Sequence, residues 1–323
     1  MLTGAANSLR GSPDMVEITK ETLEMQYRKQ RGYMTKTSVV TVILMAVSII
    51  LVHIAQALNT EGAVVNILKV LAIASFAGIF VYGYYVRKKV LPQDISAAVK
   101  QTFMQVRYDF TSDRAVDFIY SQIGRAKNYP DKTMLTLFLA DVYLFRGQVN
   151  EAISMLGSVD RSRFLHYPNT GMSFYNDIIS LYDAVGDTAS VLAAYNDAEA
   201  FIDECAFRNY LTCRTALETM IMVEKARGNY RKALDMQLIK NEYENISEND
   251  ARKVGAAQTD PMTAFNRGMI FLSTAELFYL CGDVANAGKY LDIGGPMLSP
   301  SPFFLQRANE LSGKIRQGLM NKG

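Results

Sequence analysis

This chain has no tryptophan, only two histidines and only three cysteines among its 323 residues. The cysteines, Cys205, Cys213 and Cys281, are odd in number, and no neighbouring His or second Cys pair supplies metal-ligand spacing. They are expected to be free thiols, and the sequence predicts no metal site. Phosphate loops of the Walker type and the GxSxG, HExxH and CxxC motifs are also missing. The sequence therefore predicts no catalytic residues and no cofactor.

The remaining candidates for acid–base chemistry are isolated. His53 lies in an apolar run, and His166 lies in a polar linker, where a surface position is expected. Asp203 and Glu204 are adjacent on a predicted helix and point in different directions, so they do not form a carboxylate dyad.

Two long apolar runs follow each other near the N-terminus, Ser38–Leu58 and Gly62–Val86. A helix needs roughly 20 residues to cross the hydrocarbon core of a bilayer, and each run is long enough. Neither run contains proline, and Lys69 is the one charged residue in them. The short gap between them leaves no room for a folded loop. These runs predict a transmembrane helical hairpin that contacts the lipid bilayer through residues 38–86.

Charge at the ends of the runs predicts the orientation of the hairpin. Arg28, Lys29, Arg31 and Lys36 precede the first run, and residues 87–89 are all basic, whereas the turn offers only an acidic residue. Basic flanks stay on the cytoplasmic side. We therefore expect an integral membrane protein with two spans, with both termini and the soluble domain in the cytoplasm.

Three polar residues, His53, Asn66 and Lys69, are expected at a similar depth near the outer turn. One interpretation is a small polar site in the outer leaflet. The other is that the Lys69 stem reaches the interface while one hydrogen bond joins the helices. The pair Ala74 and Gly78 is a small-xxx-small pattern that lets two helices approach closely.

Charge beyond the hairpin bears on the choice of partners. Residues 90–323 contain 24 basic and 27 acidic side chains, a net charge of −3, and the basic excess of the chain lies beside the apolar runs. A mildly acidic domain argues against nucleic acid as a partner. No small-molecule substrate is evident from the sequence.

A sequence pattern recurs in the chain beyond residue 130. A glycine follows a helical segment, a polar residue comes next, and a small or apolar residue stands five positions after the glycine. Glycine ends a helix at low cost in left-handed geometry, and Asn or Asp caps the next one. The small residue allows the second helix to press against the first. The glycines are Gly147, Gly186, Gly228 and Gly282; the residues five positions later are Ala152, Val191, Ala233 and Ala287; the expected caps are Asn150, Asp187, Asn229 and Asp283.

These four copies resemble the tetratricopeptide repeat, a two-helix unit of about 34 residues. The resemblance covers residues 131–295 and implies an all-α fold in which an α-solenoid follows the membrane hairpin. The spacing departs from the family, because the glycines step by 39, 42 and 54 residues, and the tryptophan of the repeat is absent. A generic helix bundle is the alternative fold.

The sequence thus divides into five segments. They are a cytoplasmic segment with a short helix near Asp14–Arg31 (1–36), the hairpin (37–86), a basic stretch with a degenerate helix pair (87–130), the repeats (131–295) and a C-terminal capping helix (296–323).

The resemblance implies a concave face, formed by the first helix of each pair, that binds a protein or peptide. Leu137 and Asp141 stand where the family's carboxylate-binding Lys and Asn would be, so a carboxylate clamp is not expected. The lining is apolar and acidic, which suits an amphipathic helix with basic flanks. Alternatively, Met134, Leu137 and Phe145 are core residues. The candidate groove residues are Met134, Leu137, Asp141, Phe145, Asn176, Asp183, Glu218, Met222, Lys225, Glu276 and Tyr279.

Three functional hypotheses follow. The favoured one is a membrane-anchored scaffold or adaptor that presents its helical domain at the cytoplasmic face. The alternative is a subunit of a membrane complex in which the hairpin is the functional part. A membrane-bound enzyme is the third and has the least support.

Overall fold

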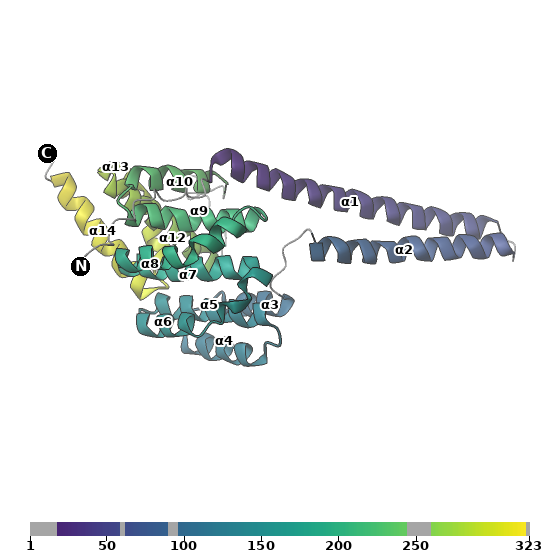
Figure 1. Cartoon of the computed structure of the whole chain (residues 1–323), viewed down its shortest axis with the longest axis horizontal. Helices are drawn as coiled ribbons and strands as arrows, with labels where there is room; N and C mark the ends of the chain where they lie inside the picture. Colours follow the sequence, from purple (N-terminus) through teal and green to yellow (C-terminus); the bar gives the residue numbers. More distant parts are fainter. Residues whose placement is uncertain (1–17, 59–61, 90–95, 244–259, 321–323) are drawn as a thin grey trace, which may run out of the picture.

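The computed structural model describes residues 18–58, 62–89, 96–243 and 260–320, and every regular element in these residues is a helix (Figure 1). The predicted all-α fold with two apolar helices at the N-terminus is therefore confirmed. The elements are α1 (Lys20–Ala57), α2 (Ala63–Lys89), α3 (Ala97–Val106), α4 (Asp113–Arg125), α5 (Tyr129–Phe145), α6 (Val149–Gly157), η1 (Arg161–His166), α7 (Pro168–Val185), α8 (Thr188–Cys205), α9 (Tyr210–Ala226), α10 (Tyr230–Tyr243), α12 (Pro261–Leu280), α13 (Val284–Gly294), η2 (Gly295–Leu298) and α14 (Pro302–Met320).

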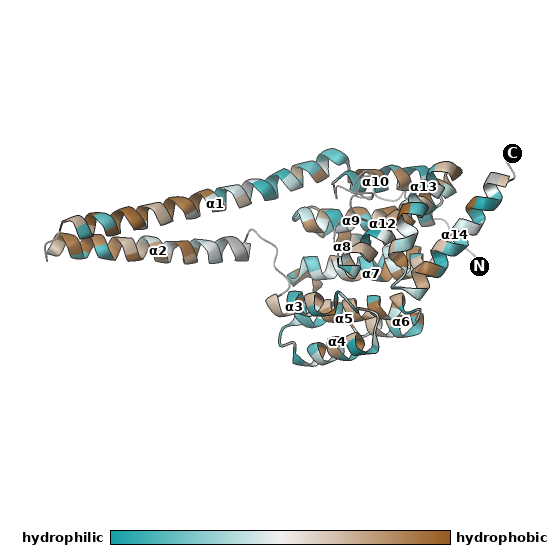
Figure 2. Cartoon of the chain, turned by 180° about the vertical axis from the view of Figure 1, so that it is seen from behind, coloured by the Kyte–Doolittle hydropathy of each residue, from teal (hydrophilic) through white to brown (hydrophobic). Residues whose placement is uncertain are grey.

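Helices α1 and α2 pack side by side as a hairpin that projects from the helical domain (Figure 1). Both are long and apolar enough to cross a membrane. Their outward side chains are apolar and exposed, for example Val42 (64%) and Ile73 (70%), and Figure 2 shows this hydrophobic half of the hairpin. Of the predicted small pair, only Gly78 faces α1, next to Leu44, whereas Ala74 is exposed.

Helix α1 is longer than the first apolar run. It begins after Thr19, whose hydroxyl accepts the Thr22 N–H at 3.2 Å, and continues without a break to Ala57. The expected short N-terminal helix and the first span are therefore one helix, and the predicted boundary at residues 36 and 37 falls inside it. The start expected at Asp14 lies outside the described residues. Hydropathy changes along α1, but the helix continues because no proline interrupts it.

The helical domain contains the helix pairs that the recurring glycine pattern predicts. Gly147, Gly186, Gly228 and Gly282 all have φ between 79° and 82°, the left-handed region that favours glycine. In each turn the N–H after the glycine bonds the carbonyl five residues earlier, at 2.8–2.9 Å. This bond satisfies a carbonyl at the helix end. The pairs are α5–α6, α7–α8, α9–α10 and α12–α13.

Small residues five positions after these glycines are fully enclosed. Ala152, Val191, Ala233 and Ala287 each have 0% exposure. Asp187 and Asp283 cap the second helices of their pairs, as predicted. The prediction for Asn150 was wrong, because this residue lies inside α6, which begins at Val149.

We expect Ala152→Leu to lower the free energy of unfolding by about 1–3 kcal/mol, because the enclosed site cannot take three more carbon atoms without strain. Ala189→Leu is the matched control, since Ala189 is exposed on α8 and the change should stay within about 0.5 kcal/mol. Urea titration of both variants measures the difference. Equal midpoints for Ala152→Leu and the parent chain would contradict the packing described here.

The pairs do not form a simple open row. Helices α5, α7 and α9 lie side by side, α10 packs on α12, and α14 contacts both α12 and α5. The start of α12 is also bonded to the end of α3, where the Met262 N–H donates to the Arg107 carbonyl at 3.1 Å. The last helices of the domain therefore pack against its first helices.

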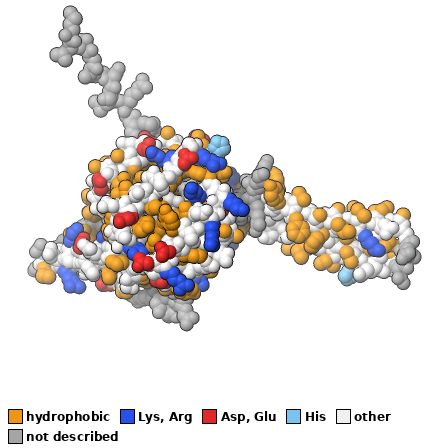
Figure 3. Space-filling model, turned by 90° about the horizontal axis from the view of Figure 1, so that it is seen from below, with side chains coloured by type: hydrophobic (Ala, Val, Ile, Leu, Met, Phe, Trp, Pro, Cys, Tyr) orange, Lys and Arg blue, Asp and Glu red, His pale blue; other side chains and the backbone are white. Residues whose placement is uncertain are grey.

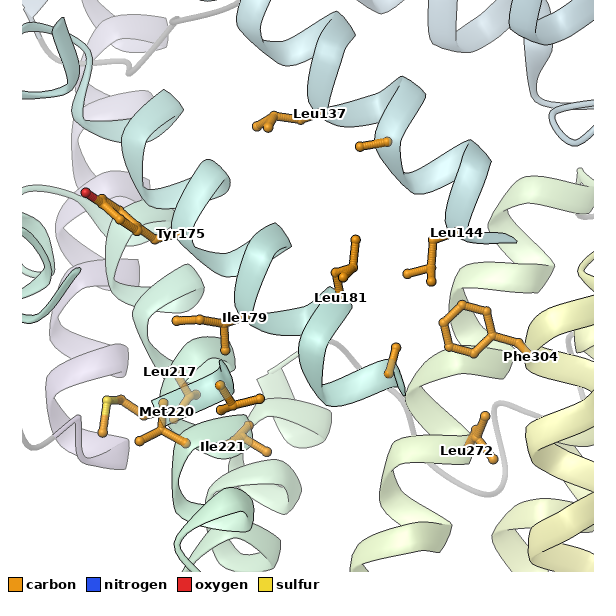
Figure 4. Packing of buried hydrophobic residues seen from close by; sticks show 14 of the residues in the cluster. Leu137, Leu144, Tyr175, Ile179, Leu181, Leu217, Met220, Ile221, Leu272 and Phe304 are labelled. Atoms are coloured by element: carbon orange, nitrogen blue, oxygen red, sulfur yellow. The ribbon is translucent and has the colours of Figure 1, made fainter. Parts of the chain in front are cut away.

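A cluster of aromatic rings packs between the first and the last helices of the domain. Phe110 and Phe145 come from the first part of the domain, and Phe265 and Phe304 come from α12 and α14. The ring centroids of Phe145 and Phe265 are 4.8 Å apart, and those of Phe145 and Phe304 are 6.0 Å apart. Figure 4 shows Phe304 directed toward Leu144 of α5. The Ser301 hydroxyl also donates to the Phe145 carbonyl at 2.6 Å, so the predicted C-terminal capping helix closes the array onto its first pair.

Candidate functional site

A half-open cavity of about 350 Å³ lies inside the array, between α7, α9, α10, α12 and α14. This size falls within the range of roughly 300–1,000 Å³ that is typical of ligand sites. Its wall combines polar side chains with an apolar floor that includes Ile221, Met222 and Phe304. Because its walls come from five helices, the cavity exists only in the assembled domain. Below it is called the polar cavity.

Lys225 bridges two acids on different helices beside the polar cavity. Its Nζ donates to Asp183 Oδ2 on α7 at 2.7 Å and to Glu276 Oε2 on α12 at 3.2 Å. Arg307 of α14 donates to the other Glu276 oxygen at 2.5 Å. All four side chains are less than 20% exposed. This network, called the Lys225 network below, joins α7, α9, α12 and α14 by charge.

The pKa shifts in the Lys225 network follow from pairing. Burial by itself raises the pKa of Glu276, but Lys225 and Arg307 outweigh burial and hold the pKa below its usual value. Burial lowers the pKa of Lys225, and Glu276 and Asp183 outweigh it in turn, so this pKa is raised. Both groups therefore stay charged at neutral pH.

Glu218 of α9 forms a second paired centre at the polar cavity. Its Oε1 lies 3.1 Å from Lys240 Nζ and 3.3 Å from Arg214 Nε. Burial raises the pKa of Glu218, but Lys240 and then Arg214 overcome that effect and lower it. The acids of the polar cavity are thus already neutralised by the chain's own cations.

Two carboxyl groups next to this region lack such compensation. Removal of Asp141 (α5) from water raises its pKa to about 7. The pKa of Asp177 (α7) is raised well above its usual value, first by burial and then by the charges of Asp141 and Glu218. Unlike the pKa of Glu218, the pKa values of both these carboxyl groups are raised above the ordinary value.

The Asp141 shift predicts a pH-dependent stability. The folded chain holds this proton up to about pH 7, whereas the unfolded chain releases it near the ordinary value of 3.8. Folded protein therefore binds more protons between these values, and stability falls as pH rises from about 4 to 7. Asp141→Asn should remove that slope and stabilise the fold at pH 8 by on the order of 1–3 kcal/mol. Urea titrations at several pH values measure both effects.

Asp117→Asn serves as the control, because Asp117 is exposed on α4 and its change should alter stability by about 0.5 kcal/mol or less. An Asp141→Asn variant with the same pH profile as the parent chain would show that this carboxyl titrates normally.

The structure brings together only part of the predicted groove. Asn176, Asp183, Glu218, Met222 and Glu276 line the polar cavity. Lys225 pairs with two of them.

The other predicted groove residues lie elsewhere. Leu137 and Phe145 are core residues, 1% and 6% exposed, and Met134 and Tyr279 pack against the core. Of the two interpretations left open for Leu137 and Phe145, burial in the core is the one observed. Asp141 belongs to the carboxyl pair described above.

Several residues of the polar cavity were absent from the sequence prediction. Gln237 and Lys240 come from α10, the second helix of its pair, and Phe304 and Arg307 come from α14. The repeat pattern assigns binding positions only to first helices, so it offers no signal for these residues. Lys240 and Arg307 come close to acids on other helices only after the chain has folded.

Comparison of the chain with protein-family models, curated proteins and solved structures finds no match.

Proposed function

We propose that this chain is a membrane-anchored interaction module whose helical domain binds a segment of a partner protein in the polar cavity. The observation that carries the proposal is the polar cavity itself, a half-open site with an apolar floor and charged walls on a domain joined to an apolar hairpin. A buried apolar floor with a polar rim suits an anchoring side chain of a partner. The stacking of α5, α7 and α9 supports a tetratricopeptide-like array.

The charges narrow the chemistry of the proposed partner. Asp183, Glu218 and Glu276 are each paired with a cation of the chain. A basic partner would have to compete with these pairs. Arg214 also pairs with Glu218, so four cations of the chain face these three acids. This surplus of positive charge favours an apolar or acidic anchoring segment over the basic-flanked helix that the sequence suggested.

Site-specific photo-crosslinking in full-length protein tests this proposal. A photoreactive residue at Asn266, on the wall of the polar cavity, should give a discrete protein adduct in cells. Ser180→Trp fills the polar cavity and should abolish that adduct, whereas Ser121→Trp, exposed on α4, should preserve it. An adduct that survives Ser180→Trp would contradict binding in the polar cavity.

A second candidate is a subunit of a membrane complex in which the hairpin makes the functional contact. The observation in its favour is that His53, Asn66 and Lys69 are exposed on the hairpin rather than enclosed between α1 and α2. Polar groups that face lipid are costly unless they reach the interface or a partner. Under this second proposal, Asn66→Leu with Lys69→Leu would release the partner, whereas Ser180→Trp would not.

The proposed topology has its own test. We place both ends of the hairpin in the cytoplasm and the turn between the spans outside. Thr60→Cys should then react with a membrane-impermeant thiol reagent in intact cells, while the native Cys281 should react only after permeabilisation. The reverse labelling pattern would invert the orientation and move the helical domain to the other side.

A further inference from the structure

One end of the helical domain is formed by the N-terminal ends of α3, α5, α7 and α9, together with η1. Contacts join these ends into a continuous surface, called the hairpin-side face below. The Ser96 N–H donates to Asp131 Oδ1 of α5 at 2.7 Å. The ring of Tyr129 at the start of α5 lies 5.4 Å from that of Tyr167. Asn209 donates to Asn169 at 3.0 Å and so links the starts of α9 and α7.

Both connections to the hairpin leave from this face. At one edge α1 is docked, because Gln26 Nε2 donates to the Phe207 carbonyl at 3.1 Å and the Tyr27 ring lies 5.4 Å from Tyr210. At the other edge, six residues (90–95) separate the end of α2 from Ser96. If the hairpin spans a bilayer, the face between these two connections must look toward that bilayer, and Figure 1 shows this arrangement.

The distance along the chain from the face to the apolar run is short enough for electrostatic attraction to the headgroups. From Gln26 to the apolar run at Ser38 there are twelve helical steps, or about 18 Å. The polar headgroup layer occupies roughly 5–8 Å of that length, and charge acts over a further 8–10 Å at physiological salt. The hairpin-side face therefore lies within electrostatic reach of the headgroups.

The composition of the face complements an anionic membrane. The face carries a group of exposed cations, although residues 90–323 as a whole carry a net charge of −3. The acids are engaged within the face: Asp131 accepts the Ser96 N–H, Asp160 accepts the Ser162 N–H, and Glu204 pairs with Arg208. The exposed cations are Lys127, Lys132, Arg161, Arg163 and Arg208. Arg161 pairs with Asp197 and Arg208 with Glu204, whereas no ion pair joins the other three to an acid among the described residues.

Apolar side chains stand among these cations. Leu165 is 54% exposed, Phe207 39% and Leu211 38%. The Arg163 guanidinium lies 4.9 Å from the centre of the Tyr129 ring, which holds it at the surface beside η1. The dipoles of α5, α7 and α9 also place their positive ends on this side. Figure 3 shows charged side chains scattered among hydrophobic ones on one side of the helical domain, whereas the hairpin is largely hydrophobic.

We propose that the hairpin-side face is a second membrane contact, which attracts anionic lipid headgroups through its arginines and lysines and holds Leu165 on the side that looks toward them. This inference rests on the proposed membrane anchoring. It means that the bilayer fixes the tilt of the helical domain, so the polar cavity is held at a defined orientation. Membranes of different charge would then present the domain differently.

Fluorescence quenching in reconstituted full-length protein tests the contact. Leu165→Cys carries the dye in a chain whose partly exposed Cys281 is replaced by Ser, since Cys205 and Cys213 are buried. Vesicles contain headgroup-nitroxide lipid in phosphatidylcholine, with or without phosphatidylserine. We expect quenching about threefold stronger with phosphatidylserine, and weaker again at high salt.

Charge reversal supplies the matched comparison. Lys132→Glu with Arg163→Glu should abolish the gain in quenching. Lys314→Glu with Arg316→Glu should leave the gain intact, because both residues are exposed on α14, on the side of the domain away from the hairpin (Figure 1).

A dye at Ile73→Cys, read with an acyl-chain nitroxide, reports separately whether the hairpin is inserted. Quenching at Ile73 without lipid-dependent quenching at Leu165 would overturn the second contact and leave the anchor intact. Such a result would assign the basic face to an acidic soluble partner instead. Absence of quenching at Ile73 would overturn the anchor and this inference together.

Discussion

Lys225→Met is expected to lower the free energy of unfolding by about 3–5 kcal/mol, because it leaves Asp183 and Glu276 buried without their shared cation. Arg307 still reaches Glu276 after this change, whereas Lys225 is the cation bonded to Asp183 in the Lys225 network. The loss should therefore be largest at neutral pH, where both acids are charged, and smaller in acid. Guanidinium or urea titration at two pH values measures it.

An exposed ion pair provides the control. Arg231 lies 3.2 Å from Asp235, with 78% and 54% of the two side chains exposed. Exposed pairs contribute little, so Arg231→Met should change stability by about 0.5 kcal/mol or less. Similar losses for Lys225→Met and Arg231→Met would mean that water reaches the Lys225 network in solution and that the array is more open than the structure.

Gly171→Leu should destabilise the helical domain by about 3 kcal/mol or more. A Cβ at Gly171 in α7 would lie 2.5 Å from Phe201 and 2.9 Å from Phe164. These two rings belong to a second aromatic cluster, which holds η1 against α7 and α8. Since Phe164 is only 3% exposed, it has no free direction in which to move. Chemical denaturation measures the loss, and detachment of η1 would also increase proteolysis in that segment.

Gly124→Leu is the matched control with the opposite sign. A Cβ at Gly124 meets nothing within 4 Å on α4, and leucine favours a helix over glycine by roughly 0.5–1 kcal/mol. A stabilised Gly124→Leu beside a destabilised Gly171→Leu would isolate the close packing at α7. Destabilisation of the same size in both would point to backbone effects rather than to the aromatic contact.

The candidate site contains some residues that the sequence could identify and others that only the folded structure reveals. The acidic positions Asp183, Glu218 and Glu276 could be selected from the repeat pattern, because each occupies the first helix of its pair. Their cations could not all be found in this way. Lys240 and Arg307 lie on α10 and α14, and their distances from Glu218 and Glu276 depend on how whole helices pack.

Hydrophobic positions show the same limit. Leu137 and Phe145 occupy helix positions that line a groove in an open array. Here the return of α12 and α14 places Phe265 and Phe304 against Phe145 and converts that position to core. An amphipathic helix pattern gives the apolar face of a helix, but it does not say whether another helix or water covers that face.

The sequence by itself determined the local features of this protein. Apolar length predicted the two hairpin helices, and left-handed glycines with small residues five positions later predicted four helix pairs, because these signals depend only on neighbouring residues. Only the tertiary structure decided that α1 runs unbroken from the domain into the hairpin, that α14 closes onto α5, and that side chains from five helices surround one cavity. These outcomes rest on contacts between residues far apart in the chain, whose free energies no local pattern records.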